Sequence, residues 1–243
     1  MRRAASAALA ILVASVDALA EEPPPAVSAP ANPANPETIV VERVVARFFA
    51  PDTGGVKNPR FVYERLLLFE ARLEALADPD RDASGKPYRS RHVVSALERH
   101  VAETLLSSLH IDPEPTTAEL TRQMQSARAR LVERIGGEVA FKAACDADGI
   151  GARDVYGLLR RQALASLYLA RMVTPMLEPT EAELRALYTR RETPFRDLPY
   201  DTIRPRLHRW YTARRLAAAV QAYYQNARGR LTLVMIGELP GAD

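Results

Sequence analysis

Apolar residues recur at helical spacing through most of the chain beyond residue 62. The first stripe has alternating intervals of four and three residues, which places its members on one face of a helix. Its members are Val62, Leu66, Phe69, Leu73 and Leu76. A second stripe, formed by Val94, Leu97, Val101 and Leu105, predicts another helix that ends before Pro113. The break between the two helices is expected at Asp78-Pro79, because proline interrupts the hydrogen-bond ladder of a helix.

Five more helices are expected after residue 115. We predict them over about 116–135, over a short stretch ending at Gly149, over about 153–173, over 181–189, and from 201 or 202 to Gly229. The first and the fourth of these begin with related heptapeptides, Glu-Pro-Thr-Thr-Ala-Glu-Leu at 114–120 and Glu-Pro-Thr-Glu-Ala-Glu-Leu at 178–184. Each heptapeptide fits a capping box, in which a threonine and a glutamate three residues later satisfy free amides of the first turn. The similarity therefore indicates two analogous helix starts.

Strand patterns occur at both ends of this helical region. Residues 39–49 are rich in Val and Phe, residues 231–236 are almost entirely apolar, and Phe61-Val62 continues as a short second strand after a loop that begins at Pro51. A single strand is not stable in water, so the last strand must pair. We predict a mainly α fold with a small β-sheet in which the N-terminal and C-terminal strands pair.

The beginning of the chain has the pattern of an export signal. Two arginines precede an apolar stretch over 4–16, and Ala18-Leu19-Ala20 offers small residues at a cleavage site. Residues 21–37 contain six prolines, which exclude a helix and favour an extended linker. We therefore expect a signal peptide at 1–20, a Pro-rich linker at 21–37 and a folded domain at 38–243, in a protein exported to the periplasm.

Composition narrows the function classes. The 243 residues are 47% hydrophobic and 26% charged, as in ordinary globular proteins. The single cysteine excludes an internal disulfide, and no uncharged stretch is long enough for a membrane span, so we expect no stable membrane insertion. The net charge is only +3, and basic and acidic residues are interspersed, so no nucleic-acid partner is expected.

Candidate sites for chemistry are weak in this sequence. Asp78, Asp80, Asp82 and Ser84 alternate as in the first half of a calcium loop, but the required glycine and glutamate are replaced by Ala83 and Arg89. A solvated acidic turn is the better interpretation. His92 and His100 are eight residues apart without a third ligand in the pattern, and Cys145 lies among alanines typical of core packing. We therefore predict no catalytic residue, no metal site and no cofactor.

Aromatic residues and methionines gather near the last helix. Met172 and Met176 close the fifth predicted helix, and Tyr211 and Tyr224 lie in the last one, together with Tyr200, Trp210 and Tyr223. Most of these side chains are expected in the core. Flexible and amphipathic side chains of these types also line surfaces that bind varied partners. Met172, Met176, Tyr211 and Tyr224 are accordingly our candidate client-binding residues, in a groove beside the last helix.

Four segments in order resemble the N-terminal domain of SurA-type periplasmic chaperones, which belong with the parvulin-like prolyl isomerases. They are the Val-rich opening strand with its helix at 64–76, the segment Asp148-Gly149-Ile150 leading to Leu159-Arg160-Arg161-Gln162, the helix from Glu178 to Tyr188, and Pro199–Arg204 with the closing strand at 231–236. The resemblance covers about residues 39–236.

Two departures from the family pattern matter for function. A longer loop at 50–59 replaces a tight glycine turn, and only residues 191–198 stand where the family inserts a parvulin domain of about a hundred residues. The resemblance therefore implies a periplasmic chaperone without isomerase catalysis. Its partners would be unfolded polypeptides, with outer-membrane proteins as candidate clients.

Two alternatives remain open. One is a degenerate prolyl isomerase, which would need convergent polar groups that the sequence does not display. The other is an envelope scaffold for one specific partner, which unlike a chaperone would ignore unrelated unfolded proteins.

We expect export to remove residues 1–20, because the basic start, apolar core and Ala18-Leu19-Ala20 match the requirements of the signal-processing machinery. Mass spectrometry of the mature protein should find Glu21 at its N-terminus. A mature chain that still begins at Met1 or Ala4 would contradict this assignment.

Overall fold

A computed structural model describes residues 42–53, 55–80, 86–195 and 197–237. The predicted signal peptide at 1–20 and the linker at 21–37 lie outside these residues. The described part is mainly helical and contains one small antiparallel sheet, which confirms the predicted fold class.

The elements follow the predicted order. The strands are β1 (Val44–Ala50), β2 (Val56–Tyr63) and β3 (Thr232–Met235). The α-helices are α1 (Glu64–Ala77), α2 (Ser90–Ser107), α3 (Thr117–Arg134), α4 (Glu138–Ala147), α5 (Ala152–Tyr168), α6 (Glu181–Thr189) and α7 (Tyr200–Arg228). The described residues also form three short helical turns: η2 (Pro51–Thr53), the π turn η3 (Leu169–Val173) and the 3-10 turn η4 (Thr174–Leu177).

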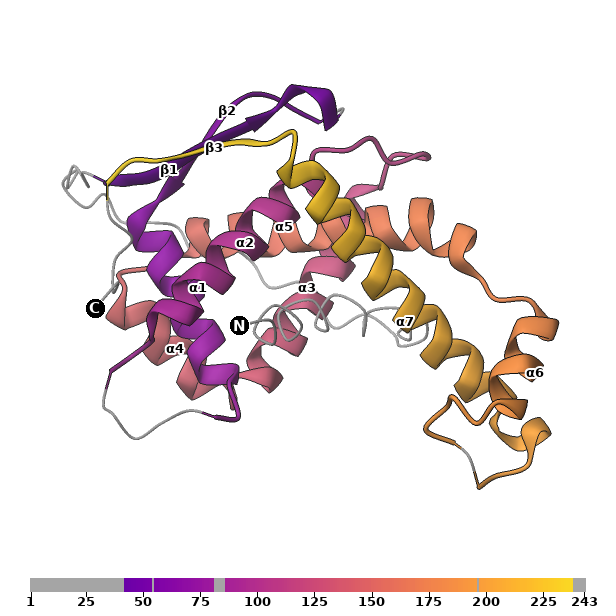
Figure 1. The fold of residues 1–243 in the computed structure, drawn as a ribbon. Helices are drawn as coiled ribbons and strands as arrows, with labels where there is room; N and C mark the ends of the chain where they lie inside the picture. Colours follow the sequence, from indigo (N-terminus) through magenta and orange to yellow (C-terminus); the bar gives the residue numbers. More distant parts are fainter. Residues whose placement is uncertain (1–41, 54, 81–85, 196, 238–243) are drawn as a thin grey trace.

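The sheet joins the two ends of the described chain. Its order is β2-β1-β3, and β1 pairs antiparallel with β3 so that Ala46 lies opposite Met235 and Phe48 opposite Leu233. This confirms the predicted pairing of the terminal strands. In Figure 1 the sheet lies over the helical body, and α7 runs up to β3.

The predicted loop at 50–59 is wrong in its second half, because β2 already begins at Val56. Pro59 cannot donate a backbone hydrogen bond, and it stands in an edge strand beside an irregularity in the register between Phe48 and Ala50. Proline is tolerated at such positions. The connection between β1 and β2 is therefore a short hairpin turn.

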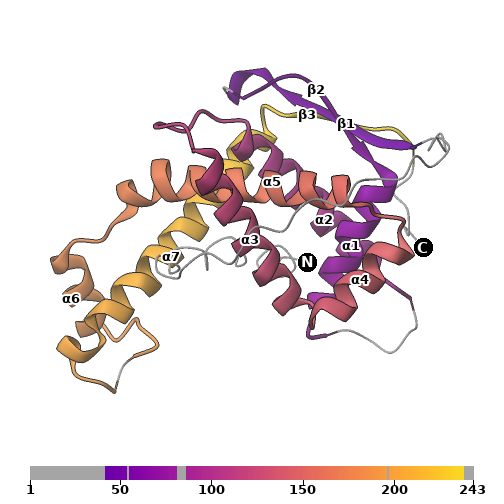
Figure 2. The ribbon, with the colours of Figure 1, turned by 180° about the vertical axis from the view of Figure 1, so that it is seen from behind.

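The core consists of the sheet, α1 and α2 on one side and a helical layer on the other. The first cluster includes Ala46, Phe48 and Val62 from the sheet, and it continues into Leu67 and Val101 from the helices. The second joins α1 to α3, α4 and α5 and includes the following buried residues: Phe69, Leu73, Leu131, Phe141 and Leu158. Figure 2 shows α5 passing through the middle of the body.

The apolar stripe predicted for α2 is displaced at its start. Val94 is exposed, whereas its neighbour Val93 is buried with Ala96 and Leu97. The apolar pattern did not show this, because the buried face of α2 also contains polar residues such as His100.

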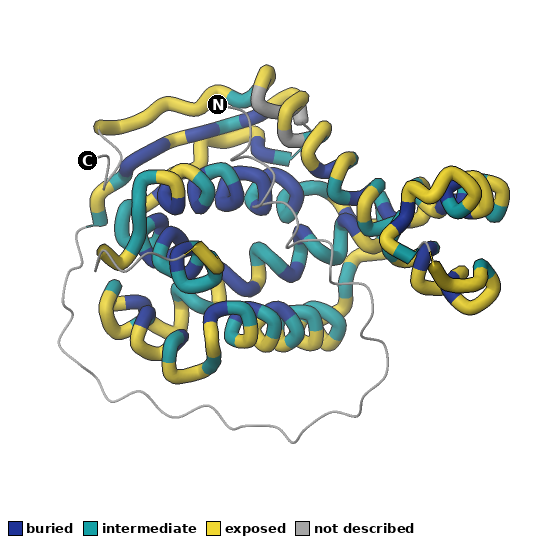
Figure 3. The backbone as a smooth tube through the Cα atoms, turned by 60° about the horizontal axis from the view of Figure 1, so that its bottom comes forward, coloured by how far each residue is buried: buried dark blue, intermediate teal, exposed yellow. Residues whose placement is uncertain are grey.

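The region from η3 to α7 projects from the body. The predicted helix over 153–173 ends as an α-helix at Tyr168, and the chain continues through η3 and η4 to α6. Leu184 of α6 packs on Ile203 and Leu207 of α7, and these residues form a small core of their own. In Figure 3 this helical arm extends to one side, with much of its backbone exposed. In the part of the chain that the structure describes, no helix has the length and apolar character needed to span a bilayer.

Both predicted capping boxes are present. The Thr116 and Thr180 side chains accept hydrogen bonds from the backbone amides of Glu119 and Glu183. The carboxylates of these two glutamates in turn accept hydrogen bonds from the backbone amides of the two threonines. Each capping glutamate also forms an ion pair with an arginine distant in sequence: Glu119 with Arg171, and Glu183 with Arg215 at 3.1 Å. The duplicated motif therefore positions each helix start relative to a second element.

We expect a chain that ends at Gly229 to be destabilised as a whole, because it loses the ladder that covers the edge of β1. At about 1 kcal/mol for each hydrogen bond, the loss should be about 3 kcal/mol and should lower the melting temperature of the single transition. Circular dichroism melting checks this, with a chain ending at Gly237 as the control that keeps β3. Equal melting temperatures for the two chains would contradict the contribution of β3.

Candidate polypeptide-binding surfaces

Met176 is the most accessible of the three candidate client-binding residues whose side chains the structure describes. It lies on η4 between the body and the arm, and 75% of its surface is exposed. The neighbouring Leu177 is partly buried against Leu216 and Val220 of α7, so η4 is anchored while Met176 faces solvent. Such a flexible apolar side chain on an anchored turn can adapt to varied partners.

The other candidate residues differ in accessibility. Met172, on the π turn, and Tyr211, on α7, are half-buried. The Tyr211 ring stacks on Trp210 with 6.4 Å between centroids, and the Arg215 guanidinium lies 5.2 Å from its centre. Tyr211 therefore contributes to the packing of the arm, while the side chain of Tyr224 lies outside the described part. The structure brings Met176 and Tyr211 onto neighbouring elements but places Tyr211 in a separate apolar cluster.

The largest collection of exposed apolar side chains lies on the sheet, which the sequence reasoning did not identify as a surface. Eleven large apolar side chains are prominently exposed in the described chain, and six of them belong to the sheet or directly follow it. They are Phe61, Tyr63, Leu233, Val234, Met235 and Ile236. A continuous apolar run such as 231–236 is typical of a strand buried on both faces. Here it forms an exposed edge strand, which Figure 3 shows along the rim of the sheet.

Basic side chains accompany this apolar surface. Arg47, Lys57, Arg60 and Arg230 are exposed, and none has an ion-pair partner among the described residues. Asp52 is the one acidic residue in the β1–β2 hairpin, 44–63, and the segment 229–237 contains none. The neighbouring glutamates are already paired, Glu42 with Arg65 and Glu64 with Arg43 at 3.2 Å. The sheet therefore carries uncompensated positive charge.

A cluster of ionisable side chains lies inside the helical body, where a binding partner cannot reach it. Glu70 of α1 is fully buried; its carboxylate lies 2.6 Å from the Arg161 guanidinium of α5 and 2.9 Å from His100 Nδ1 of α2. Arg161 also reaches Glu103 of α2 at 3.2 Å. These four residues connect three helices, and their burial indicates a structural role.

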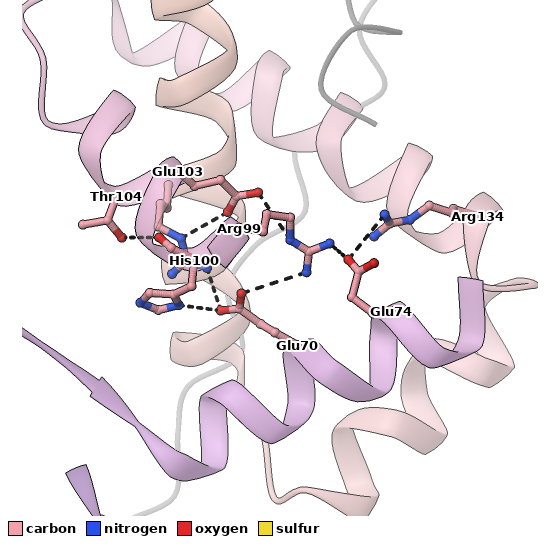
Figure 4. A network of polar contacts seen from close by, with 8 residues as sticks. Glu70, Glu74, Arg99, His100, Glu103, Thr104 and Arg134 are labelled. Carbon is pink, nitrogen blue, oxygen red and sulfur yellow. Dashed lines mark hydrogen bonds and ion pairs between the residues drawn. The ribbon is translucent and has the colours of Figure 1, made fainter. Parts of the chain in front are cut away.

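The ionic cluster extends along α1 toward α3. Arg99 forms ion pairs with Glu74 and, at 3.7 Å, with Glu103, while Arg134 lies 3.8 Å from Glu74. Figure 4 shows these side chains pointing toward one another between the helices. Burial, together with the nearby positive charge of Arg99, lowers the pKa of Arg134 to about 10.

The electrostatics of Glu70 follow from competing effects. Burial alone would raise the pKa of its carboxyl group, but the positive charges of Arg161, His100 and Arg99 and the hydrogen bond from His100 outweigh it and hold the pKa at about 2. The carboxyl group is therefore ionised in the folded protein at neutral pH. The sequence contained a signal for this residue, since Glu70 interrupts the apolar face that includes Phe69 and Leu73.

The residues considered for metal chemistry have structural partners. Asp78 lies 2.9 Å from His92 Nε2 at the start of α2, and this hydrogen bond lowers the pKa of Asp78. Residues 81–85, including Asp82 and Ser84 of the considered calcium loop, lie outside the described part. Among the described residues, no cluster of three or more His, Cys, Asp and Glu side chains is arranged to hold a metal ion. Cys145 is half-buried beside the helical core, and burial raises the pKa of its thiol.

The segment at 148–162 is held by arginines of α1. Arg72 binds Asp148 at 2.7 Å, and Arg65 donates to the Gly149 carbonyl at 2.7 Å and to Asp154 at 2.9 Å. Further along the same segment, Arg161 enters the buried cluster. These contacts give a structural reason for the polar residues that the sequence analysis singled out here.

Comparisons with protein-family models, with curated proteins and with solved structures found no significant match.

We expect Glu70 to make the free energy of unfolding depend on pH in the acidic range. Its pKa falls from about 4.5 in the unfolded chain to about 2 in the folded one, so its contribution is complete above pH 4.5 and is lost as the pH falls toward 2. The substitution Glu70→Gln should cost about 3–5 kcal/mol at neutral pH, because it leaves buried cations unpaired. It should also flatten the decline in stability between about pH 5 and about pH 3.

Urea unfolding at a series of pH values measures both effects. Glu138→Gln, which removes an exposed ion pair with Arg128, is the matched control and should retain the full acid dependence. An unchanged slope in Glu70→Gln would show that other carboxylates govern acid unfolding. If that variant does not fold, Glu103→Gln removes a second buried partner of Arg161 and tests whether loss of a buried ion pair lowers the free energy of unfolding at neutral pH.

Proposed function

We propose that this protein is a chaperone-like polypeptide-binding protein of the periplasm, which holds unfolded or outer-membrane-bound polypeptides without prolyl isomerase catalysis. The observation that carries the proposal is the concentration of exposed apolar side chains on the sheet, to which the exposed Met176 adds one further apolar contact. Exposed apolar surface has a free-energy cost in water, and its local concentration is characteristic of interaction sites.

The distribution of polar groups supports the same function. Ionisable groups with several partners lie at helix contacts, as in the Glu70–Arg161–Glu103 cluster, and no substrate reaches a fully buried carboxylate. Polypeptide binding needs no such group, because apolar contact and backbone hydrogen bonds provide the binding energy.

The order of elements also supports a SurA-type architecture. An opening strand leads into α1, the arginine-held segment 148–162 follows, and α7 returns from the arm to the closing strand β3. Residues 190–199, at the position where the family inserts its isomerase domain, join α6 to α7 at the end of the arm. This connection supports a holding function without isomerisation, with the clients implied by the resemblance.

A scaffold for one specific envelope partner is the second candidate function. Its supporting observation is the uncompensated charge of Arg47, Lys57, Arg60 and Arg230, which favours partners of one charge sign. Promiscuity separates the two functions, since a chaperone acts on unrelated unfolded chains and a scaffold does not.

We expect the protein to slow the aggregation of several unrelated unfolded clients, measured by light scattering after dilution from urea. Met176→Ser should require roughly two- to fivefold more protein for the same effect, because one adaptable apolar contact is lost. Its melting temperature should stay nearly unchanged, since the side chain is exposed.

Val139→Ser is the matched control, because Val139 is equally exposed but lies on α4 in the body. Tyr211→Ser should lower the melting temperature, in accord with its packing on Trp210. Protection of a single client would favour the scaffold, and protein-dependent turnover of a proline peptide would favour the isomerase. Failure with every client would overturn the proposal.

A further inference from the structure

Strand β3 presents open backbone groups along its outer edge. The amide of Ile236 donates to the carbonyl of Val45 at 2.8 Å. Opposed residues of an antiparallel pair alternate between hydrogen-bonded and non-hydrogen-bonded positions. With the observed register, Val234 and Thr232 also direct their backbone groups toward β1, so those of Leu233 and Met235 point outward. No described residue forms a backbone hydrogen bond with this outer edge.

The side chains of the edge make the open backbone unusual. Long, apolar edge strands promote association, and proteins commonly protect them with charges, prolines or bulges. Leu233, Val234 and Met235 are all apolar and 38–39% exposed. β3 is short, but its own residues carry no charge that would repel an incoming strand.

The charges beside the edge select among possible occupants. Arg47 lies opposite Val234 on the adjacent strand, and Arg230 lies two residues before the start of β3. Neighbouring strands are about 4.8 Å apart, so the long side chain of Arg47 can reach over β3 toward a strand added at its edge. Lys57 and Arg60 on β2 extend the same positive field across the sheet.

Two other occupants agree less well with these features. A second copy pairing β3 with β3 would bring the same unpaired arginines together, and like charges repel. An anionic lipid surface would match the charge, but it cannot form the strand-to-strand hydrogen bonds that the outer edge requires. An extended acidic chain satisfies both the backbone and the charges.

We propose that the edge of β3 is a docking site for an extended, acidic polypeptide segment, which adds as a fourth strand and places carboxylates near Arg47 and Arg230. Apolar residues of the segment would alternate with the acidic ones and cover the exposed β3 side chains. This inference rests on the proposed polypeptide-binding function and specifies one binding mode and one partner chemistry for it.

The test uses the full chain and a short fluorescent peptide in which valine alternates with glutamate, titrated by fluorescence anisotropy. Leu233→Pro removes an outward-facing amide without removing a donor to β1, so binding should be lost. Leu233→Thr keeps the amide and trims the apolar side chain, and it should retain most of the affinity. Melting temperatures of both variants verify that the sheet remains formed.

A second part of the experiment tests the charge requirement. The double variant Arg47→Gln/Arg230→Gln should weaken binding roughly five- to tenfold, and added salt should weaken the wild-type complex. The same peptide with lysine in place of glutamate should not bind. Equal binding of both peptides would overturn the charge assignment, and full binding by a folded Leu233→Pro variant would overturn strand addition.

The remaining outcomes also decide the question. If vesicles of phosphatidylglycerol bind and the peptide does not, the surface is a lipid site. If Leu233→Pro dissolves a dimer seen by sedimentation, the occupant is a second copy. If the wild-type protein does not bind the peptide but still protects unfolded clients, the edge site alone is refuted, whereas failure of the wild-type protein in both assays refutes the proposed function as well.

Discussion

The buried carboxylate of Glu70 is the constraint on which the helical body depends. An isolated charge in an apolar interior has a large desolvation cost, so its position is tolerated only with cations in contact. Arg161 on α5 provides such a cation, His100 on α2 adds a hydrogen bond, and Glu103 then balances Arg161. The cluster therefore fixes the relative positions of α1, α2 and α5, because any displacement would leave a buried charge without its partner.

This fixed body determines which surfaces remain open. The inner faces of β1 and β2 pack on α1 and α2, so the opposite face of the sheet and its β3 edge remain toward solvent. α5 continues through η3 and η4 to the arm, where Leu184, Ile203 and Leu207 form a separate small core. Accessible apolar side chains therefore remain on the sheet and at η4, the junction that carries Met176.

The sequence predicted those parts of the fold that depend on interactions between residues close together in the chain. The capping boxes of α3 and α6 and the apolar face of α1 depend on residues a few positions apart, and they were predicted correctly. The pairing of β1 with β3 was predicted because the last strand needed a partner and the N-terminal strand was the plausible one. The ionic cluster was not predicted, because Glu70, Glu103 and Arg161 come from three different helices. Charged residues in a sequence ordinarily indicate a solvated face.

The candidate site was less predictable for the same reason. The sequence identified Met176 and Tyr211 by residue type, but only packing distinguishes an exposed methionine from a tyrosine stacked on Trp210. The apolar run of β3 indicated a strand that must pair, but not that it would form an edge of the sheet, and its exposure results from that place. Neither the edge position of β3 nor the lack of ion-pair partners for Arg47 and Arg230 among the described residues is encoded in a local pattern.

The pairing of β1 with β3 has a consequence for biosynthesis. Ala46 meets Met235, so the sheet cannot close until nearly the whole described chain has left the ribosome. Contacts this distant in sequence form late, because the closure entropy of the intervening chain must be overcome first. While residues 46–235 are being synthesised, the nascent chain therefore lacks its complete sheet, and the helices must form and pack before the last strand closes it.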